Sequence, residues 1–150
     1  MRLTARKVDG SLRDLSRVKG LLERAFPKNE QFPMFLLRLR AWSSYVHFLA
    51  YYDGDDFCGF TYTVENEDMV FVLYLAVNDE IRSKGYGTAI LADLKARASG
   101  RGVALNIEPL DPHAANSEQR VRRLDFYRRN GFFSTDYNLI DGGDRYLILC

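Results

Sequence analysis

The sequence predicts a mixed α/β (α+β) fold, in which a mostly antiparallel, twisted sheet of about seven strands is flanked by about four helices. The chain has 150 residues, 47% hydrophobic and 27% charged, which suits a single domain spanning residues 1–150. Short runs rich in β-branched and aromatic residues alternate with turn residues. Segments with apolar residues at helical spacing lie between these runs.

The N-terminal region is predicted to form one strand and two helices. Residues 3–8 alternate in polarity, after which Ser11 is expected to cap a helix that Pro27 ends. A second helix is expected from about Glu30 to Trp42, with a proline in its first turn. The expected apolar stripes are Leu12, Leu15, Val18, Leu21, Leu22 and Ala25 in the first helix and Phe35, Leu36, Leu39 and Trp42 in the second.

The middle of the chain is predicted to form three antiparallel strands. Residues 45–52 and 57–65 are rich in β-branched and aromatic residues, and the DGDD between them indicates a hairpin. Residues 69–77, MVFVLYLAV, are continuously apolar, which predicts a central strand covered on both faces. Strict alternation would place Phe71, Leu73 and Leu75 on one face and Val70, Val72, Tyr74 and Ala76 on the other.

The C-terminal half is predicted to add two helices and three strands. The first helix carries an apolar stripe at helical spacing and ends at Gly100. A capping box of Asn116 and Gln119 would begin the second helix, and five arginines within residues 120–129 are expected on its solvated face. The expected strands cover residues 103–107, 132–140 and 145–149, the last two forming a hairpin around DGG.

Charge, cysteine content and hydropathy exclude several classes of protein. The formal net charge of +1 produces no overall field that would attract nucleic acid. Cys58 and Cys150 have no CxxC or Cys/His spacing, so neither a disulfide framework nor a metal site is expected. The N-terminus lacks the apolar core of a signal peptide, and no segment has the roughly 20 apolar residues that span a bilayer. No membrane association is expected, and the expected compartment is the cytoplasm.

Charge is unevenly distributed along the chain. Residues 1–40 carry ten Lys or Arg and four Asp or Glu, whereas residues 41–81 carry no Lys or Arg and eight Asp or Glu. This acidic middle segment is the one hint about a substrate, because it would attract a cation. Asp53, Asp55 and Asp56 are better explained as solvated turn residues.

A glycine-rich loop, RSKGYGT at residues 82–88, follows the predicted central strand and opens a helix. Backbone N–H groups at such a position can bind phosphate, and glycine lets a ligand approach the backbone closely. The Walker pattern requires GxxxxGK followed by Ser or Thr, but here one residue separates the glycines. The dinucleotide fingerprint requires a third glycine where Ile90 stands. Neither nucleotide-binding loop fits.

Two motifs together resemble the GNAT superfamily of N-acetyltransferases. Residues 82–87 read R-x-x-G-x-G, which is similar to the acyl-CoA pyrophosphate loop of that superfamily. DFYRRNGFF at residues 125–133 is similar to the FYxxxGF signature that closes the same fold, with the spacing of the superfamily between them. The resemblance spans roughly residues 45–150. It implies a GNAT-like fold, acetyl-CoA as the acyl donor and no metal.

The resemblance implies a donor site made largely of backbone groups. The loop residues Arg82, Ser83, Lys84, Gly85, Tyr86, Gly87 and Thr88 would bind the CoA diphosphate. The backbone of Leu75, Ala76 and Val77 would hold the pantetheine and the thioester carbonyl, because in the superfamily this strand splays from the next. Relatives often have proline where Asp79 stands, so a less rigid entrance to the loop is expected.

The resemblance also implies direct attack of an amine on the thioester, which requires a general base and a general acid. Tyr127 occupies the tyrosine position of FYxxxGF and would protonate the CoA thiolate; a packed helix tyrosine is the alternative. Glu108 is the leading candidate base, because it shares a strand face with Asn106, where some relatives have glutamate. Glu65 and then Glu67 are the next candidates, and an amine bound neutral would need no strong base. Glu65 and Asn106 are the expected acceptor contacts.

The predicted function is acetyl-CoA-dependent N-acetylation of a primary amine, expected to be small and cationic. A protein or peptide N-terminal or lysine acetyltransferase is the enzymatic alternative. A non-catalytic acyl-CoA-binding regulatory domain is the alternative from another class. The first two helices and the loop at residues 110–115 are expected to form the acceptor pocket, but they carry no motif that identifies the acceptor. The resemblance is as consistent with a homodimer as with a monomer.

Overall fold

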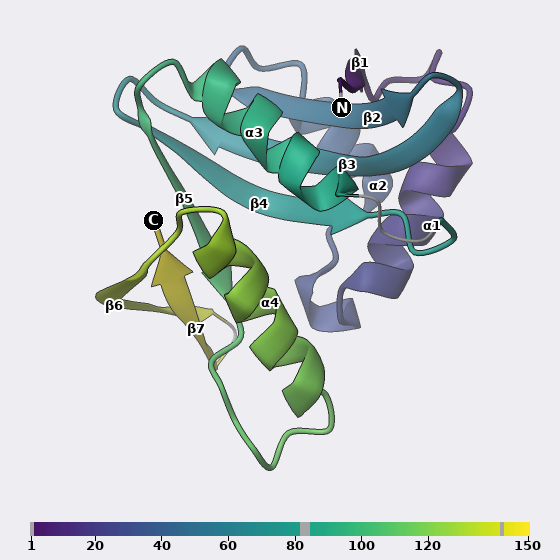
Figure 1. Cartoon of the computed structure of the whole chain (residues 1–150). Helices are drawn as coiled ribbons and strands as arrows, with labels where there is room; N and C mark the ends of the chain where they lie inside the picture. Colours follow the sequence, from purple (N-terminus) through teal and green to yellow (C-terminus); the bar gives the residue numbers. More distant parts are fainter. Residues whose placement is uncertain (1, 82–84, 142) are drawn as a thin grey trace.

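The computed structural model describes residues 2–81, 85–141 and 143–150. Within these residues, one seven-stranded sheet has the order β1-β2-β3-β4-β5-β7-β6 (Figure 1). The strands are β1 (Thr4–Lys7), β2 (Val46–Asp53), β3 (Asp56–Glu65), β4 (Met69–Val77), β5 (Gly102–Ile107), β6 (Ser134–Asp141) and β7 (Asp144–Leu149). The helices are α1 (Leu15–Ala25), the 3-10 helix η1 (Lys28–Glu30), α2 (Met34–Arg40), α3 (Tyr86–Ala98) and α4 (Ser117–Arg129). The predicted fold class is confirmed.

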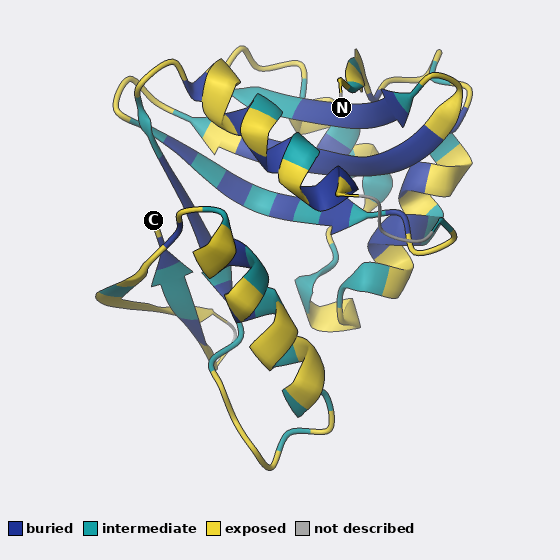
Figure 2. Cartoon of the chain, viewed as in Figure 1, coloured by how far each residue is buried: buried dark blue, intermediate teal, exposed yellow. Residues whose placement is uncertain are grey.

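The sheet is antiparallel except at one pair of strands. The neighbours β4 and β5 are parallel, and α3 connects them. At the other end of the sheet β7 lies between β5 and β6, so the last hairpin adds its second strand to the sheet interior. Figure 2 shows the difference in burial that results: β2 and β3 are buried along most of their length, whereas β6 is an exposed edge.

Helices cover both faces of the sheet. Alternate residues of β2 face opposite layers: Phe48 and Ala50 belong to the core cluster with α1 and α2, whereas Leu49 and Tyr51 lie against α3. Helix α4 packs on β5 and β7 through Leu124 and neighbouring side chains. The central strands therefore lie between two helical layers (Figure 1).

The first helix begins later than predicted. Ser11 does not cap it, because its N–H and hydroxyl both donate to Asp9 Oδ1 in a turn, at 2.9 and 2.6 Å. Asp14 is the N-cap residue, but its side chain makes no capping hydrogen bond. Instead its carboxylate accepts a hydrogen bond from the Tyr52 hydroxyl at 2.9 Å. A tertiary contact has replaced the expected local cap.

The apolar stripe predicted for the second helix is wrong. Phe35, Leu39 and Trp42 are 71%, 66% and 90% exposed, and the buried residue of α2 is Leu37. Residues 28–30 form a separate 3-10 helix, and Pro33 precedes a helix of only seven residues. So short a helix takes its orientation from tertiary contacts, here the Tyr62 hydroxyl donating to the Leu37 carbonyl at 2.9 Å.

The central strand does not alternate strictly between two faces. Tyr62 pairs with Tyr74 and the next residue of β3, Thr63, pairs with Val72, so Leu73 is an extra residue in β4. Val72 packs in the cluster under α3 and α4, whereas Tyr74 packs in the cluster under α1 and α2. The bulge moves the later side chains of β4 to the opposite faces from those predicted.

Candidate active site

Strands β4 and β5 separate halfway along β4. They pair from Met69 with Gly102 to Val72 with Leu105. From Leu105 onward β5 pairs with β7 on its other edge and, within the described chain, residues 74–77 of β4 pair with β3 alone. The two strands diverge visibly in Figure 1. The free edge of β4 therefore has backbone groups available to a ligand, as expected for this strand.

A cavity of about 440 Å³ lies where the strands part. Residues 72–77 of β4, residues 105–107 of β5 and Glu108 just after β5 line it, so Leu75, Ala76, Val77, Asn106 and Glu108 all contribute. Its other walls are the end of α1 and its connection to α2, the exposed turn of the β6–β7 hairpin, and α4. The end of α1 and the connection to α2 thus contribute, whereas neither α2 itself nor residues 110–115 are among the described lining residues.

The first turn of α3 lies directly beyond β4. Gly85, its N-cap, has φ +83°, a left-handed conformation that favours glycine. A Cβ on Gly87 would lie 2.9 Å from the Phe126 ring and 3.3 Å from the Val77 side chain, so glycine permits this close contact. N–H groups in the first turn of a helix have no acceptor within the helix. These groups, including that of exposed Thr88, are suited to an anion.

Only part of the predicted loop lies in the described chain. Arg82, Ser83 and Lys84 lie outside the described residues. The Tyr86 side chain is buried, and its hydroxyl donates to Asp53 Oδ2 at 2.9 Å. This hydrogen bond is the largest cause, and burial the next, of a pKa of Tyr86 that is raised to about 12. Tyr86 can therefore serve a ligand through its backbone N–H, while its ring anchors α3 to the β2–β3 turn.

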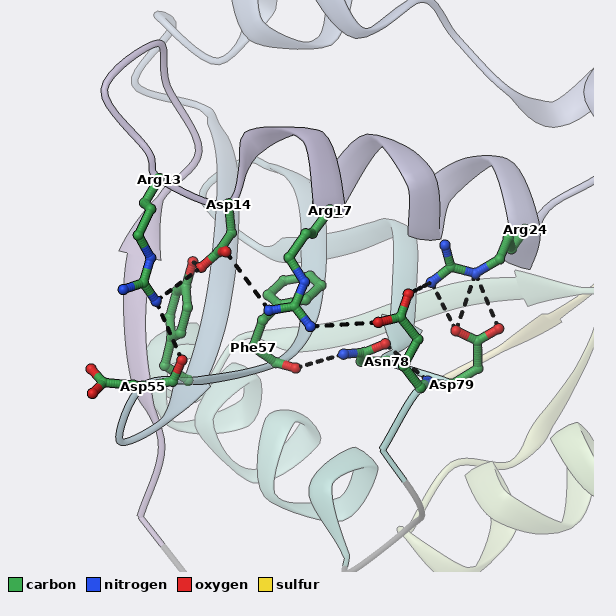
Figure 3. Close-up of polar contacts among 10 residues, drawn as sticks. Arg13, Asp14, Arg17, Arg24, Asp55, Phe57, Asn78 and Asp79 are labelled. Carbon is green, nitrogen blue, oxygen red and sulfur yellow. Dashed lines mark hydrogen bonds and ion pairs between the residues drawn. The ribbon is translucent and has the colours of Figure 1, made fainter.

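The entrance to the loop is tethered by α1. The Arg24 guanidinium contacts both carboxylate oxygens of Asp79, at 2.8–3.2 Å (Figure 3). The Asn78 amide, buried just before it, donates to the Phe57 carbonyl at 2.9 Å. Hydrogen bonding to Arg24 lowers the pKa of Asp79 below its usual value. The expected loosening at this position is offset by a two-point ion pair.

Tyr127 combines a buried ring with a hydroxyl that faces the cavity. The residue is 6% exposed, and its ring packs edge-on against Phe126 and Phe132 at centroid distances of 5.1 and 5.7 Å. Within the described chain its hydroxyl has no hydrogen-bond partner, although it lines the cavity. Burial raises its pKa to about 12, so at neutral pH it is a proton donor.

Glu108 lines the same cavity, but its carboxylate is already engaged. Oε2 lies 2.7 Å from Arg120 Nη2, and Oε1 lies 3.6 Å from Arg123 Nη1. The Asn116 amide donates to Oε1 at 3.1 Å, and its oxygen accepts from Arg120, so the predicted capping box does not form. Two arginines predicted to be solvated thus enclose the leading candidate base.

Glu65, the other predicted acceptor contact, lies elsewhere. Its carboxylate is 3.1 Å from both His47 Nε2 and Arg101 Nη2, in a separate depression beside α3. None of the eight carboxylates of the acidic middle segment is among the described residues that line the cavity between β4 and β5. The structure brings Asn106, Glu108 and Tyr127 together and leaves Glu65 apart.

Two side chains of the cavity were not predicted from the sequence. Glu30 ends η1, and Tyr146 lies on β7; both line the cavity. Neither belongs to a motif, and Glu30 was assigned to the second helix. The two prolines at positions 27 and 33, which isolate residues 28–32 as a connection, are the signal that could have drawn attention to Glu30.

The described residues offer neither a metal site nor a membrane-spanning helix. No group of three or more His, Cys, Asp or Glu side chains in this part of the chain is arranged to hold a metal ion. Among its helices, none is sufficiently long and apolar to cross a membrane.

Comparison with known proteins identifies the family. The model of the acetyltransferase (GNAT) domain matches residues 43–133. YjbC of Bacillus subtilis (strain 168), which carries a provisional acetyltransferase name, is 34% identical over 68 residues, 45% of this chain. The match covers 33% of YjbC, so the chain spans about a third of that relative's length.

Solved structures share the fold at low sequence identity. An aminoglycoside 6'-N-acetyltransferase complexed with coenzyme A is 15% identical, with a TM-score of 0.71 over 97% of this chain and 94% of that one. Naa50 of Arabidopsis thaliana, in complex with the bisubstrate analogue CoA-Ac-MVNAL, is 19% identical, with a TM-score of 0.67 over 100% and 99%. Because the family model covers more than half of the sequence, the chain belongs to the GNAT acetyltransferase family.

Proposed function

We propose that the protein is an acetyl-CoA-dependent N-acetyltransferase whose acceptor is a small cationic amine. The observation that carries this proposal is the position of the Tyr127 hydroxyl, which lacks a protein partner in the described chain and faces a cavity. That cavity adjoins the free edge of β4. A proton donor beside unpaired backbone groups suits a thioester whose sulfur must leave as a thiol.

The donor end of the cavity comprises residues 75–77 of β4, the first turn of α3 and Tyr127. Free backbone groups of residues 75–77 would hold the pantetheine and the thioester carbonyl. The N–H groups of α3 would receive the diphosphate, and Gly87 would allow the helix to begin close to α4. The Tyr127 hydroxyl would donate its proton to the departing thiolate. No metal is required for this chemistry.

The acceptor end comprises Glu30, Glu108, Asp141 and Tyr146. Three carboxylates from separate segments line this end of the cavity. Arg120 and Arg123 neutralise Glu108, which leaves the other two carboxylates to attract an ammonium group. This arrangement supports a cationic acceptor, from residues other than the acidic middle segment that first suggested one.

The test combines binding and turnover. The protein is incubated with acetyl-CoA and a panel of polyamines, aminoglycosides, amino acids and peptides, and free CoA thiol is followed. Thiol release that depends on a small amine supports the proposal, and release only with peptides would make the enzyme a peptide or protein acetyltransferase. Tight acetyl-CoA binding without release for any acceptor would favour a regulatory acyl-CoA-binding domain.

A further inference from the structure

Glu30 is held in place over the cavity by its backbone. The Tyr74 hydroxyl, on the part of β4 that has separated from β5, donates to the Glu30 carbonyl. The same hydroxyl accepts a hydrogen bond from the Phe32 N–H at 3.1 Å. The Gln31 amide donates to the Phe26 carbonyl at 2.7 Å, which closes the connection onto the end of α1. This segment is therefore ordered across the opening between the strands.

The Glu30 carboxylate is free although its surroundings are partly buried. Within the described chain it has no hydrogen-bond or ion-pair partner, and it lines the cavity. Burial, and then the charge of Glu108, raises the pKa of Glu30 above its usual value, while Arg123 lowers it. A carboxylate in this condition accepts a proton more readily than a solvated one.

Tyr146 supplies a second, independent sign of a ligand. It is 6% exposed and lines the cavity, yet its hydroxyl has no partner among the described residues. The residue is buried but its hydroxyl oxygen is not, since it is absent from the buried atoms that lack a partner, so the hydroxyl is open to a polar ligand group in the cavity. The Asn29 amide donates to Asp144 Oδ2 at 3.1 Å, so the β6–β7 turn is joined to η1 next to both side chains.

Glu108 offers the opposite environment within the same cavity. Both of its oxygens are occupied by Arg120, Arg123 and Asn116. An incoming ammonium ion would have to displace at least one of these contacts before Glu108 could take its proton. Glu108 is suited to fixing the arginines of α4 and to adding negative charge near Glu30.

We propose that Glu30 is the general base and that the Tyr146 hydroxyl positions the acceptor amine beside it. This inference rests on the proposed acetyltransferase function and replaces Glu108 in the role expected from the sequence. It identifies the acceptor as an amine that arrives protonated, because a free carboxylate and an unpaired hydroxyl together bind an ammonium group.

The proposed acetyl transfer begins with proton removal by Glu30. The Glu30 carboxylate takes one proton from the ammonium group, and the freed nitrogen lone pair forms a C–N bond to the thioester carbonyl carbon. The C–S bond electrons leave with sulfur, and Tyr127 donates a proton to the thiolate. The nitrogen then loses a second proton, which restores the Tyr127 hydroxyl. Glu30 releases its proton to solvent, so the products are an acetamide, CoA thiol and one proton.

Several charged or titratable groups face Glu30 and shape its titration. They are Glu108 just after β5, Arg120 and Arg123 of α4, Asp144 at the start of β7, and Tyr146 and Tyr74 of the neighbouring strands. The carboxylates favour the protonated form of Glu30 and the arginines favour the ionised form. The acidic limb of the rate profile is expected to lie above the ordinary glutamate value of 4.5.

The kinetic test compares Glu30→Gln with Glu23→Gln, a solvent-exposed glutamate of α1, as matched control. We expect kcat/KM of Glu30→Gln to fall about 100-fold at neutral pH. We also expect the acidic limb of its pH–rate profile to shift with the pKa of the acceptor amine that is tested. In the wild type and in Glu23→Gln the limb stays at one pH for acceptors of different pKa. Tyr146→Phe is expected to raise the acceptor KM several-fold and to leave the limb in place.

A second measurement does not need turnover. A carbon-13 carboxyl NMR titration of the wild-type protein, assigned with Glu30→Gln, should give Glu30 a midpoint above 4.5. A midpoint at or below that value would overturn the inference, as would an unchanged acidic limb in a stable, acetyl-CoA-binding Glu30→Gln protein. Failure of the proposed function is distinct, because the wild type itself would then release no CoA thiol.

Discussion

The proposed donor end and the proposed acceptor end of the cavity are built by different means. In the described residues, the donor end relies on backbone: the free edge of β4, a left-handed Gly85 and a helix start that needs glycine at position 87. The acceptor end relies on side chains from η1, β5 and the β6–β7 hairpin, segments far apart in the sequence. Backbone binding requires a contiguous motif, whereas side-chain binding requires only a common location. The donor end can therefore be predicted from a contiguous stretch of sequence. The residues of the acceptor end can differ between proteins without changing any motif.

The largest expected effect breaks the donor end. Gly87→Val places side-chain atoms against the Phe126 ring, from which even a Cβ would be 2.9 Å away, so the start of α3 or the ring must move. We expect acetyl-CoA affinity to fall at least about 100-fold, measured by calorimetry, because directed N–H groups lose their geometry. Ala92→Val, on the exposed side of the same helix, is the control. Retained affinity in a folded Gly87→Val protein would contradict the assignment of the loop.

The next largest effect is expected from a substitution that removes the proposed proton donor and preserves its packing. Tyr127→Phe keeps the ring contacts with Phe126 and Phe132. We expect kcat to fall about 100-fold with acetyl-CoA affinity unchanged, because only the leaving thiolate needs the hydroxyl. Tyr51→Phe, which loses a buried hydrogen bond to Asp93 in another part of the molecule, should lower stability and leave kcat alone. Equal kcat values for wild type and Tyr127→Phe would leave Tyr127 as a packing residue.

A moderate effect distinguishes the two glutamates of the acceptor end. Glu108→Gln leaves Arg120 and Arg123 without their counterion, which we expect to cost about 1–3 kcal/mol of stability in denaturant unfolding. Loss of the Glu108 charge also lowers the pKa of Glu30, so the acidic limb should move to lower pH and persist. Disappearance of the limb would return the role of base to Glu108.

The control for this change is Glu118→Gln. Glu118 pairs with Arg122 at 3.5 Å, but their side chains are 89% and 75% exposed. An exposed ion pair contributes little, so stability should change by less than about 0.5 kcal/mol.

The smallest effect concerns stability and pH. The pKa of Glu30 is higher in the folded protein than in the unfolded chain. Glu30 therefore stabilises the fold fully at a pH below its pKa in the unfolded chain. This stabilisation is lost as the pH rises through its pKa in the folded protein. Glu30→Gln avoids this loss, and its Tm should exceed that of the wild type by about 1–2 °C at neutral pH. The gap should close at about pH 4, as followed by scanning calorimetry. A lower Tm for Glu30→Gln at neutral pH would mean that the carboxylate stabilises the fold.

Local sequence reasoning failed where another side-chain contact, within a turn for Ser11 and more distant for Asn116, competed with the expected helix cap. Ser11 and Asn116 are both good capping residues, yet Asp9 and Glu108 take their side-chain hydrogen bonds. Helical periodicity also misassigned Phe35, because a helix of seven residues does not select its own buried face. The bulge at Leu73 carries no sequence signal, although it decides where every later side chain of β4 points.

The sequence by itself determined the order of the elements, the central strand and the family, because hydrophobic periodicity, turn residues and two contiguous motifs act locally. It also singled out Tyr127 as the candidate proton donor, because the position of this residue in a motif is fixed. Only the tertiary structure decided which carboxylates share the cavity, which of them is already paired, and that Glu30 and Tyr146 meet there. These properties depend on distances between remote segments and on exclusion of water, and neither is encoded at any single position of the chain.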